Sequence, residues 1–106
     1  MQRALLAALL GGLFLAPAAH ATTHEVVQKG NEFSTKVLKV KAGDDVSFLN
    51  EDPHFHNVFS LSDAKSFDLG SYPKGQSRKV VFDKPGTVEV ECAIHPKMKL
   101  TVEVAK

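Results

Sequence analysis

This 106-residue sequence contains only one cysteine and no tryptophan, and its formal net charge is only +1. The single cysteine is the most informative of these features. One cysteine cannot form an internal disulfide, so Cys92 is either an idle buried thiol or the ligand of a bound group. Small domains in oxidising compartments commonly use paired cysteines as cross-links, and this chain lacks them. The question that the sequence raises first is therefore what Cys92 binds.

Long apolar runs are also scarce, and the one that is present lies at the N-terminus. Residues 4–15 are apolar apart from two glycines, follow the positive charge of Arg3 and precede a small-x-small sequence at residues 19–21. The run is too short for a membrane-spanning helix, and the arrangement is typical of a cleaved export signal. We expect residues 1–21 to be a signal peptide and residues 22–106 to be one periplasmic domain with no membrane span.

Charge of one sign is missing from the expected mature chain. Arg3 is the only one of the 13 lysines and arginines that is lost with the signal, so twelve basic residues remain against 12 acidic ones. Proteins that bind nucleic acids usually carry a basic excess gathered on one face. We therefore expect no nucleic-acid partner.

The remaining sequence has the pattern of a β protein. Valine is far commoner than leucine after residue 21, and no stretch shows sustained helical spacing of apolar residues. Short apolar runs separated by turn signals predict an antiparallel sandwich or barrel. The segment 62–76, which contains Gly70, Pro73 and Gly75, is expected to be irregular. Strands are expected at residues 25–28, 36–40, 46–50, 58–61, 78–82, 87–92 and 100–104.

The chemistry is concentrated in one short motif near the C-terminus. Two residues separate Cys92 from His95, and two more separate His95 from Met98. One loop between adjacent strands can point all three side chains at one centre, and His56 can join them from another strand. A thiolate, two imidazoles and a weak axial thioether are the ligand set of a type 1 copper site. The motif therefore predicts one type 1 copper ion per chain.

These motifs resemble the small cupredoxins, the group that includes amicyanin, plastocyanin and pseudoazurin. Residues 33–58, which end in His56-Asn57-Val58, resemble the first-ligand region of that family, and residues 92–98 resemble its ligand loop, most closely the short loop of amicyanin. The resemblance implies an all-β fold, a Greek-key β-sandwich with the metal site at one end. The site residues that it implies are the ligands His56, Cys92, His95 and Met98, with Asn57 as a brace behind them.

The same resemblance implies a function. It indicates a periplasmic electron-transport protein, and not an enzyme, that shuttles single electrons by cycling between Cu(I) and Cu(II). The expected partners are a cytochrome or an oxidoreductase such as a dehydrogenase, docking near His95, and the protein is expected to be a monomer. The alternative is a periplasmic copper-binding protein for copper resistance or buffering that uses the same four ligands. A multicopper oxidase needs a further histidine cluster, which the mature sequence lacks.

Two positions depart from the family. Ala93 stands where the family often has serine or threonine, so one side-chain link between the ligand loop and Asn57 is missing. Ile94 stands where amicyanin and plastocyanin have proline, and its backbone N–H can donate to the Cys92 sulfur. A hydrogen bond to the sulfur favours Cu(I). We therefore predict that Ile94→Pro lowers the reduction potential.

Several weaker signals complete the prediction. His54 reads as a solvated loop histidine near the copper end, with a second metal contact or a pH-sensing role as the alternative. Cleavage after Ala21 leaves Thr22-Thr23-His24, a sequence that can wrap Cu(II) in a square-planar set. Lysines near the ligand loop and in the irregular segment read as ordinary solvated residues, with a weak basic rim for an acidic redox partner as the alternative. These lysines are Lys65, Lys74, Lys97 and Lys99, and an apolar surface around His95 can be formed by Pro53, Phe55 and Pro96.

Overall fold

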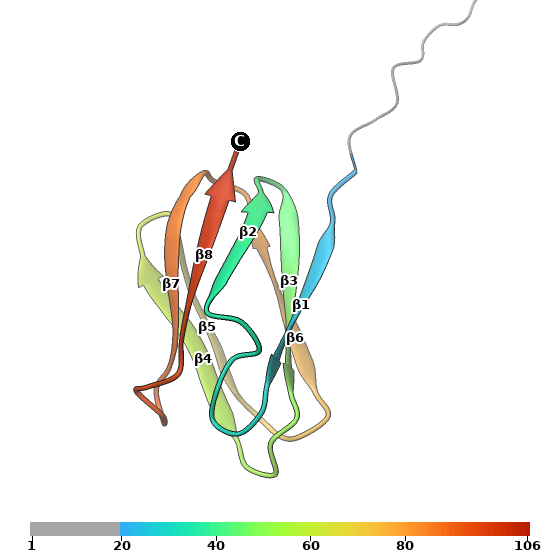
Figure 1. Cartoon of the computed structure of the whole chain (residues 1–106), viewed down its shortest axis with the longest axis vertical. Helices are drawn as coiled ribbons and strands as arrows, with labels where there is room; N and C mark the ends of the chain where they lie inside the picture. The colour runs from blue at the N-terminus through green and yellow to red at the C-terminus, as the bar shows by residue number, and fades with distance from the viewer. Residues whose placement is uncertain (1–19) are drawn as a thin grey trace, which may run out of the picture.

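A computed structural model describes residues 20–106 of the chain. The signal peptide predicted for residues 1–21 falls almost wholly outside these described residues. Within them the chain forms eight β-strands and no helix, in agreement with the predicted all-β fold (Figure 1). The strands are β1 (Thr23–Gln28), β2 (Val37–Lys41), β3 (Asp44–Asn50), β4 (His56–Ser62), β5 (Lys65–Tyr72), β6 (Ser77–Phe82), β7 (Gly86–Cys92) and β8 (Lys99–Ala105).

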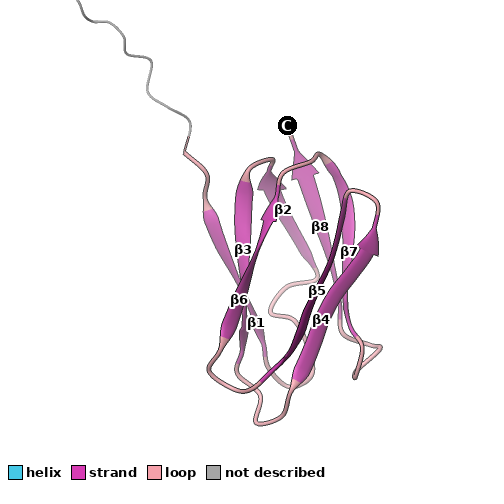
Figure 2. Ribbon diagram, turned by 180° about the vertical axis from the view of Figure 1, so that it is seen from behind, coloured by secondary structure: helices cyan, strands magenta, loops and turns pink. Residues whose placement is uncertain are grey.

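The strands form two sheets that face each other as a sandwich (Figure 2). One sheet has the order β1-β3-β6, and the other has the order β2-β8-β7-β4-β5. Valines and phenylalanines on the inner faces pack into one core, because successive side chains of a strand alternate between its two faces. In β3 this alternation buries Val46, Phe48 and Asn50 together.

Two strand pairs differ from the antiparallel arrangement that the sequence predicted. β1 runs parallel to β3, and β2 runs parallel to β8. The chain crosses from one sheet to the other between β1 and β2 and crosses back between β2 and β3. Two reversals of direction leave β1 and β3 running the same way, so a crossover between the sheets replaces the hairpin that an antiparallel pair allows.

The prediction that residues 62–76 are irregular is wrong over half of the segment, because the segment contains β5. Phe67 and Leu69 are half-buried while Ser66 and Asp68 are exposed, so the alternation of a strand is present. Gly70 interrupts this alternation in the sequence. Its φ is 71°, and it lies at a bulge where the register with β4 shifts. β5 is also an edge strand, paired with β4 alone in its sheet, and edge strands carry a weaker apolar pattern.

The two ends of the sandwich differ in the elements they gather. The turn after β3, the start of β4 and the loop between β7 and β8 lie at the lower end in Figure 1, while the starts of β1, β3 and β5 lie at the opposite end. None of the described residues forms a helix long and apolar enough to cross a membrane. The lower end is the one to which the sequence assigns the metal site.

Candidate metal centre

Three predicted ligands meet at this end of the sandwich. Cys92 is the last residue of β7 and His56 is the first residue of the neighbouring strand β4, so strand pairing brings them together. The Sγ atom of Cys92 lies 3.6 Å from Nδ1 of His56 and 4.0 Å from Nδ1 of His95. Metal–ligand bonds of about 2.0–2.3 Å place neighbouring ligand atoms roughly 3.5–4 Å apart. The sulfur and both nitrogens are therefore spaced as ligands of one ion.

Met98 closes the ligand loop. Its backbone N–H donates to the carbonyl oxygen of His95 across 2.9 Å, which folds the loop into a tight turn before β8 begins. The Met98 side chain is fully buried, whereas the loop residue Ile94 is half exposed. The thioether thus lies inside the protein on the loop that carries Cys92 and His95, and its role as the fourth ligand stays a prediction.

The orientation of His56 is fixed from its far side by Asp52. Nε2 of His56 donates to Oδ2 of Asp52 across 2.6 Å, and both side chains are almost completely buried. A proton on Nε2 leaves Nδ1 with a free lone pair, and Nδ1 is the atom that faces Cys92. A carboxylate behind a histidine ligand holds the ring in place and makes it a stronger donor. The sequence analysis did not identify Asp52 as part of the site.

Asp52 is itself held as an anion. Its two carboxylate oxygens accept the backbone N–H groups of Gly30 and Asn31 at 2.7 and 3.0 Å, from consecutive residues with positive φ angles of 65° and 58°. Burial raises the pKa of Asp52, but the hydrogen bonds from His56, Asn31 and Gly30 outweigh it and lower the pKa to about 2. The buried site therefore contains a fixed negative charge behind His56.

Asn57 braces the sulfur through its backbone rather than through a side-chain link. Its N–H donates to Sγ of Cys92 at 3.5 Å, and its carbonyl oxygen accepts the N–H of Ala93 at 3.0 Å. The alanine at position 93 therefore leaves a main-chain connection intact between the ligand loop and β4. A second hydrogen bond to the sulfur, from Ile94, stays a prediction.

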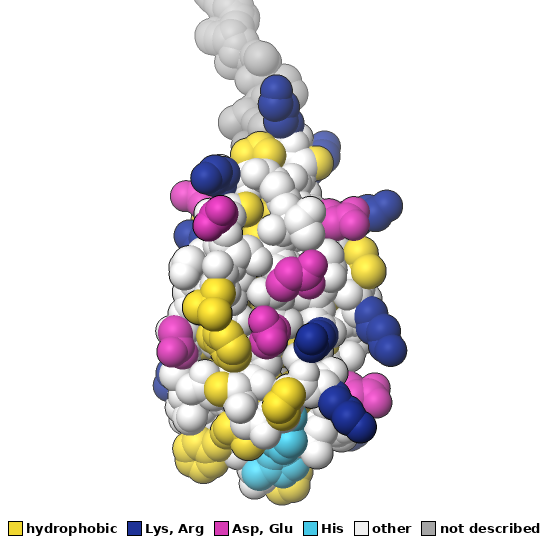
Figure 3. All heavy atoms as spheres, turned by 90° about the vertical axis from the view of Figure 1, so that its left-hand side faces the viewer, with side chains coloured by type: hydrophobic (Ala, Val, Ile, Leu, Met, Phe, Trp, Pro, Cys, Tyr) yellow, Lys and Arg dark blue, Asp and Glu magenta, His cyan; other side chains and the backbone are white. Residues whose placement is uncertain are grey.

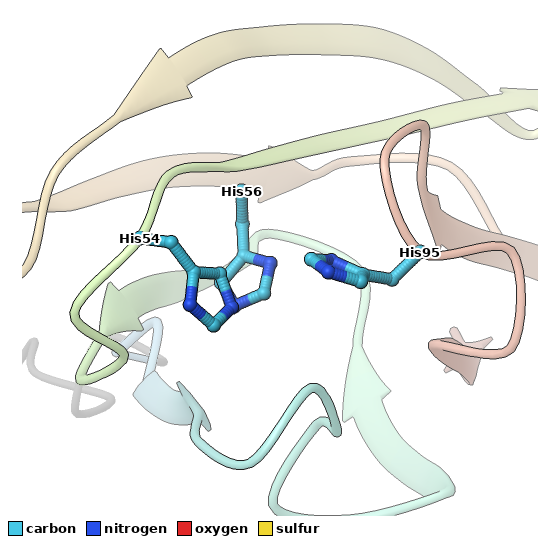
Figure 4. A group of neighbouring side chains, drawn as sticks. All are labelled: His54, His56 and His95. Atoms are coloured by element: carbon cyan, nitrogen blue, oxygen red, sulfur yellow. The ribbon is translucent and has the colours of Figure 1, made fainter.

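His54 lies closer to the centre than a solvated loop residue would. Its ring centroid is 5.0 Å from that of His56 and 5.3 Å from that of His95, and one ligand atom from each of the three rings lies within 4.8 Å of the others (Figure 4). Nε2 of His54 is 2.6 Å from Oδ1 of Asn31. His54 therefore faces the site and keeps about half of its side chain exposed.

The N-terminal sequence Thr22-Thr23-His24, which could wrap Cu(II), instead contacts Asp44 at the other end of the sandwich. Nε2 of His24 lies 3.0 Å from Oδ2 of Asp44, and the N–H of Thr22 donates to Oδ1 of the same carboxylate at 2.9 Å. The strand β1, which contains His24, is paired along its length with β3. A square-planar copper site needs the backbone nitrogens of these residues, so its formation would break the edge of the sheet.

A groove runs beside the ligand loop. It has a volume of about 550 Å³ and lies between the loop and the segment that links β1 to β2. Its apolar lining includes Phe33, Ile94 and Pro96, and its basic lining comprises Lys36, Lys97 and Lys99. On this end of the molecule, histidine side chains reach the surface among hydrophobic ones (Figure 3). Phe55, between β3 and β4, has about half of its area exposed.

The predicted basic rim is only partly present. Lys97 and Lys99 line the groove, but Lys65 opens β5 at the opposite end of the sandwich and lies 3.7 Å from Asp83. Lys36, which the sequence analysis did not single out, takes its place. The position of Lys65 was mispredicted for the same reason that β5 was missed. A segment taken as irregular does not indicate at which end of the sandwich Lys65 lies.

The donor atoms fit copper better than a hard cation. A buried thiol sulfur and two imidazole nitrogens converge, and a buried thioether lies on the same loop. Soft sulfur ligands favour Cu(I), and imidazole suits copper in both oxidation states. Calcium and magnesium prefer oxygen ligands, and the nearby carboxylate of Asp52 is already occupied by His56 and two amides.

Comparison with known proteins agrees with this chemistry. Two curated proteins of Methylorubrum extorquens strain AM1 are similar to the chain. Methylamine utilization protein MauL is 33% identical over 90 residues, covering 84% of this chain and 78% of MauL. Amicyanin-alpha is 32% identical over 97 residues, covering 89% of this chain and 82% of amicyanin-alpha.

Solved structures show the same fold. A Cu(I) structure of a methionine-to-alanine variant of amicyanin matches with a TM-score of 0.72 and 26% identity, covering 77% of this chain and 81% of that one. A copper-containing nitrite reductase from Thermus scotoductus SA-01 matches with a TM-score of 0.75 and 28% identity over 86% of this chain, which spans only 24% of the enzyme. Residues 20–105 match the model of the copper binding proteins of the plastocyanin/azurin family. The cupredoxin-like fold and the copper cofactor are thereby confirmed, and the chain belongs to the plastocyanin/azurin family of copper-binding proteins.

Proposed function

We propose that this protein is a periplasmic type 1 copper protein that carries single electrons between redox partners, with His56, Cys92, His95 and Met98 as its copper ligands. Membership of the family supports copper-based electron transfer, and the expectation of an electron carrier rather than an enzyme agrees with it. The observation that carries the proposal is the convergence of one sulfur and two Nδ1 atoms within 4.0 Å.

Each side chain has a distinct part in this function. When bound, copper supplies the one-electron change between Cu(I) and Cu(II). Cys92, His56 and His95 would hold the ion, and the buried Met98 would be a weak fourth ligand that tunes the potential. The anionic Asp52 holds the ring of His56, so little rearrangement accompanies the change of charge.

The first experiment is the addition of Cu(II) to the purified apo-protein while the visible spectrum is recorded. We expect an intense thiolate-to-copper charge-transfer band that ascorbate bleaches and an oxidant restores. The matched variant Cys92→Ser should lose the band, because an alcohol is a poor ligand for copper.

A copper-buffering protein with the same four ligands would show the same band and would differ in lacking electron exchange with a redox partner, whereas one that binds copper elsewhere predicts a different spectrum. A weak or absent band together with tight copper binding would move the site away from Cys92 and favour copper storage. Tight binding that survives in Cys92→Ser would have the same meaning. Since His24 is hydrogen-bonded to Asp44 at the other end of the molecule, the structure offers little support for a storage site there.

The periplasmic location rests on the signal peptide predicted for residues 1–21. The first residue tied into the sheet is Thr22, whose carbonyl oxygen accepts the N–H of Asp45 at 3.1 Å. A cleavage after Ala21 would therefore leave every strand of the sandwich intact. Mass spectrometry of the protein exported by a bacterial host should find Thr22 as its first residue, and a chain retaining Met1 would contradict the assignment.

Partner docking is proposed at the groove beside His95. Redox partners need close approach to a ligand, and both His95 and Met98 line the groove. Three lysines, Lys36, Lys97 and Lys99, surround its apolar lining, whereas Glu32 is its only carboxylate. This balance favours a partner with an acidic docking site and makes its association rate fall with salt. MauL, by its name, serves methylamine utilization, so a dehydrogenase for an amine is one candidate donor to test.

A further inference from the structure

His54 is the one imidazole near the metal centre that the proposed four-ligand site does not use. It is held firmly for a surface residue, because its Nε2 contacts Oδ1 of Asn31 at 2.6 Å and its carbonyl oxygen accepts a hydrogen bond from Nδ2 of Asn50 at 2.9 Å. The amide of Asn50 is also bonded to the carbonyl of Tyr72 in the core. Loop, ring and core are thus linked, and the ring stands beside the site on a fixed support.

Exposure to solvent separates the three clustered imidazoles into an order. The side chain of His54 is 46% exposed, that of His95 is partly buried, and that of His56 is completely buried. Cys92 is buried as well. Seen in Figure 4, His54 and His56 come from one segment, and His95 approaches them from the facing ligand loop. An ion arriving from solvent therefore meets His54 and His95 before it meets His56 and Cys92.

This order of exposure matters because imidazole is a good ligand for copper. Imidazole binds copper in both oxidation states, and a pair of imidazoles holds it more strongly than water does. One nitrogen atom from each of the three rings lies within 4.8 Å of those from the other two, so an ion can exchange one imidazole for the next without returning to bulk solvent. We propose that His54 is a copper-uptake ligand, which captures the incoming ion together with His95 and passes it to His56 and Cys92.

The transfer is a ligand exchange and involves no change of oxidation state. His54 and water leave the ion as His56 and the Cys92 sulfur bind it, and the thiol proton of Cys92 is released to solvent. Because the final ligands are the same whatever the route, His54 changes how fast copper arrives and leaves but does not change the affinity. This inference rests on the proposed copper site and adds the path by which that site is filled.

The test compares His54→Gln with His24→Gln in copper loading of the apo-protein by stopped-flow absorbance, with Cu(II) in glycine buffer as the source. Glutamine at position 54 keeps an amide N–H for Asn31 and removes the imidazole. We expect loading to slow several-fold in His54→Gln and removal of copper by excess chelator to slow by the same factor. The dissociation constant, the final spectrum and the reduction potential should match those of the unmodified protein, and His24→Gln should change none of these.

Three outcomes would overturn the inference. Loading of His54→Gln at the unmodified rate would show that copper reaches the site without this ring. A changed spectrum, potential or dissociation constant would mean that His54 belongs to the final site or merely supports it. Loading that slows without an equal change in removal would break the required reversibility. Failure of the proposed function looks different, since the unmodified protein would then show no thiolate charge-transfer band at all.

Discussion

Among the described residues, one histidine–aspartate hydrogen bond lies at each end of the sandwich, and the two pairs differ in what lies beyond the ring. At one end, His24 contacts Asp44 at 3.0 Å, and at the other, His56 contacts Asp52 at 2.6 Å. Both carboxylates also accept two backbone N–H groups, and both have a pKa of about 2. The local chemistry of the two pairs is therefore nearly the same.

Only one pair has a free ring nitrogen aimed at other ligands. Nδ1 of His56 faces the sulfur of Cys92 with His95 beyond it, whereas His24 lies on a strand that only ties one sheet edge together. The His56 pair is also completely buried, while His24 remains partly exposed. A histidine held by a carboxylate thus becomes a metal ligand only where the fold supplies partners on its other side.

The largest effect should come from removing each histidine in turn. We expect His56→Gln to abolish the intense thiolate–copper band, because the buried site loses one of its three strong ligands. His24→Gln should leave the band unchanged. Titration of both apo-variants with Cu(II) checks this, and an intact band in His56→Gln would exclude His56 as a ligand.

The next effect concerns the two carboxylates. Asp52→Asn removes the negative charge behind His56, so it should weaken copper binding by about 10–100-fold. It should also raise the reduction potential, because that charge stabilises Cu(II) more than Cu(I). Asp44→Asn is the matched control, and voltammetry should find its potential unaltered. Equal potentials in both variants would mean that Asp52 acts only as a structural support.

Acidic pH should distinguish the two histidine–aspartate pairs through the stability of the apo-protein rather than through metal binding. Hydrogen bonds from His24, Lys41 and Thr22 lower the pKa of Asp44 from its ordinary 3.8 to about 2. A lowered pKa gives stability that is complete above about pH 4 and is lost as the pH falls through about 2. Urea unfolding of apo Asp44→Asn should therefore show a smaller loss over this range than the unmodified apo-protein. Asp52 contributes to the loss that remains, and an unchanged pH profile would contradict the low pKa of Asp44.

The smallest effect is expected at the sulfur itself. Asn57 already donates a hydrogen bond to Sγ of Cys92, so a second donor at Ile94 adds to an existing one. Ile94→Pro removes that N–H and should lower the reduction potential, while Ile94→Ala should leave it nearly unchanged. A potential that is unchanged or higher in the proline variant would show that Asn57 is the only donor.

Much of the fold was predictable because the apolar alternation of the strands survives in the sequence. Each predicted strand has its counterpart, and the core valines lie where the alternation places them. The failures have physical reasons. β5 was hidden by a glycine at a bulge, and the parallel pairing of β1 with β3 depends on crossovers between sheets that no local pattern records.

The site divides in the same way. Cys92, His95 and Met98 could be proposed as ligands because one loop carries them at regular spacing, whereas Asp52 could not be assigned to the site. Its contact with His56 depends on the turn between β3 and β4, and its amide partners come from Gly30 and Asn31 in a distant loop. The only local signal was a carboxylate four residues before a histidine, which is too common to select. His54 was noticed, but its nearness to His95 depends on the tertiary fold.

The contact between Thr22 and Asp44 has a consequence for the maturation of the protein. In the full chain the nitrogen of Thr22 is an amide that donates to the carboxylate at 2.9 Å. The cut expected after Ala21 would turn the same nitrogen into an α-ammonium group, and the hydrogen bond into an ion pair between two opposite charges. Removal of the leader would then strengthen a contact that the precursor makes through a neutral amide, and would hold the start of the first strand more firmly.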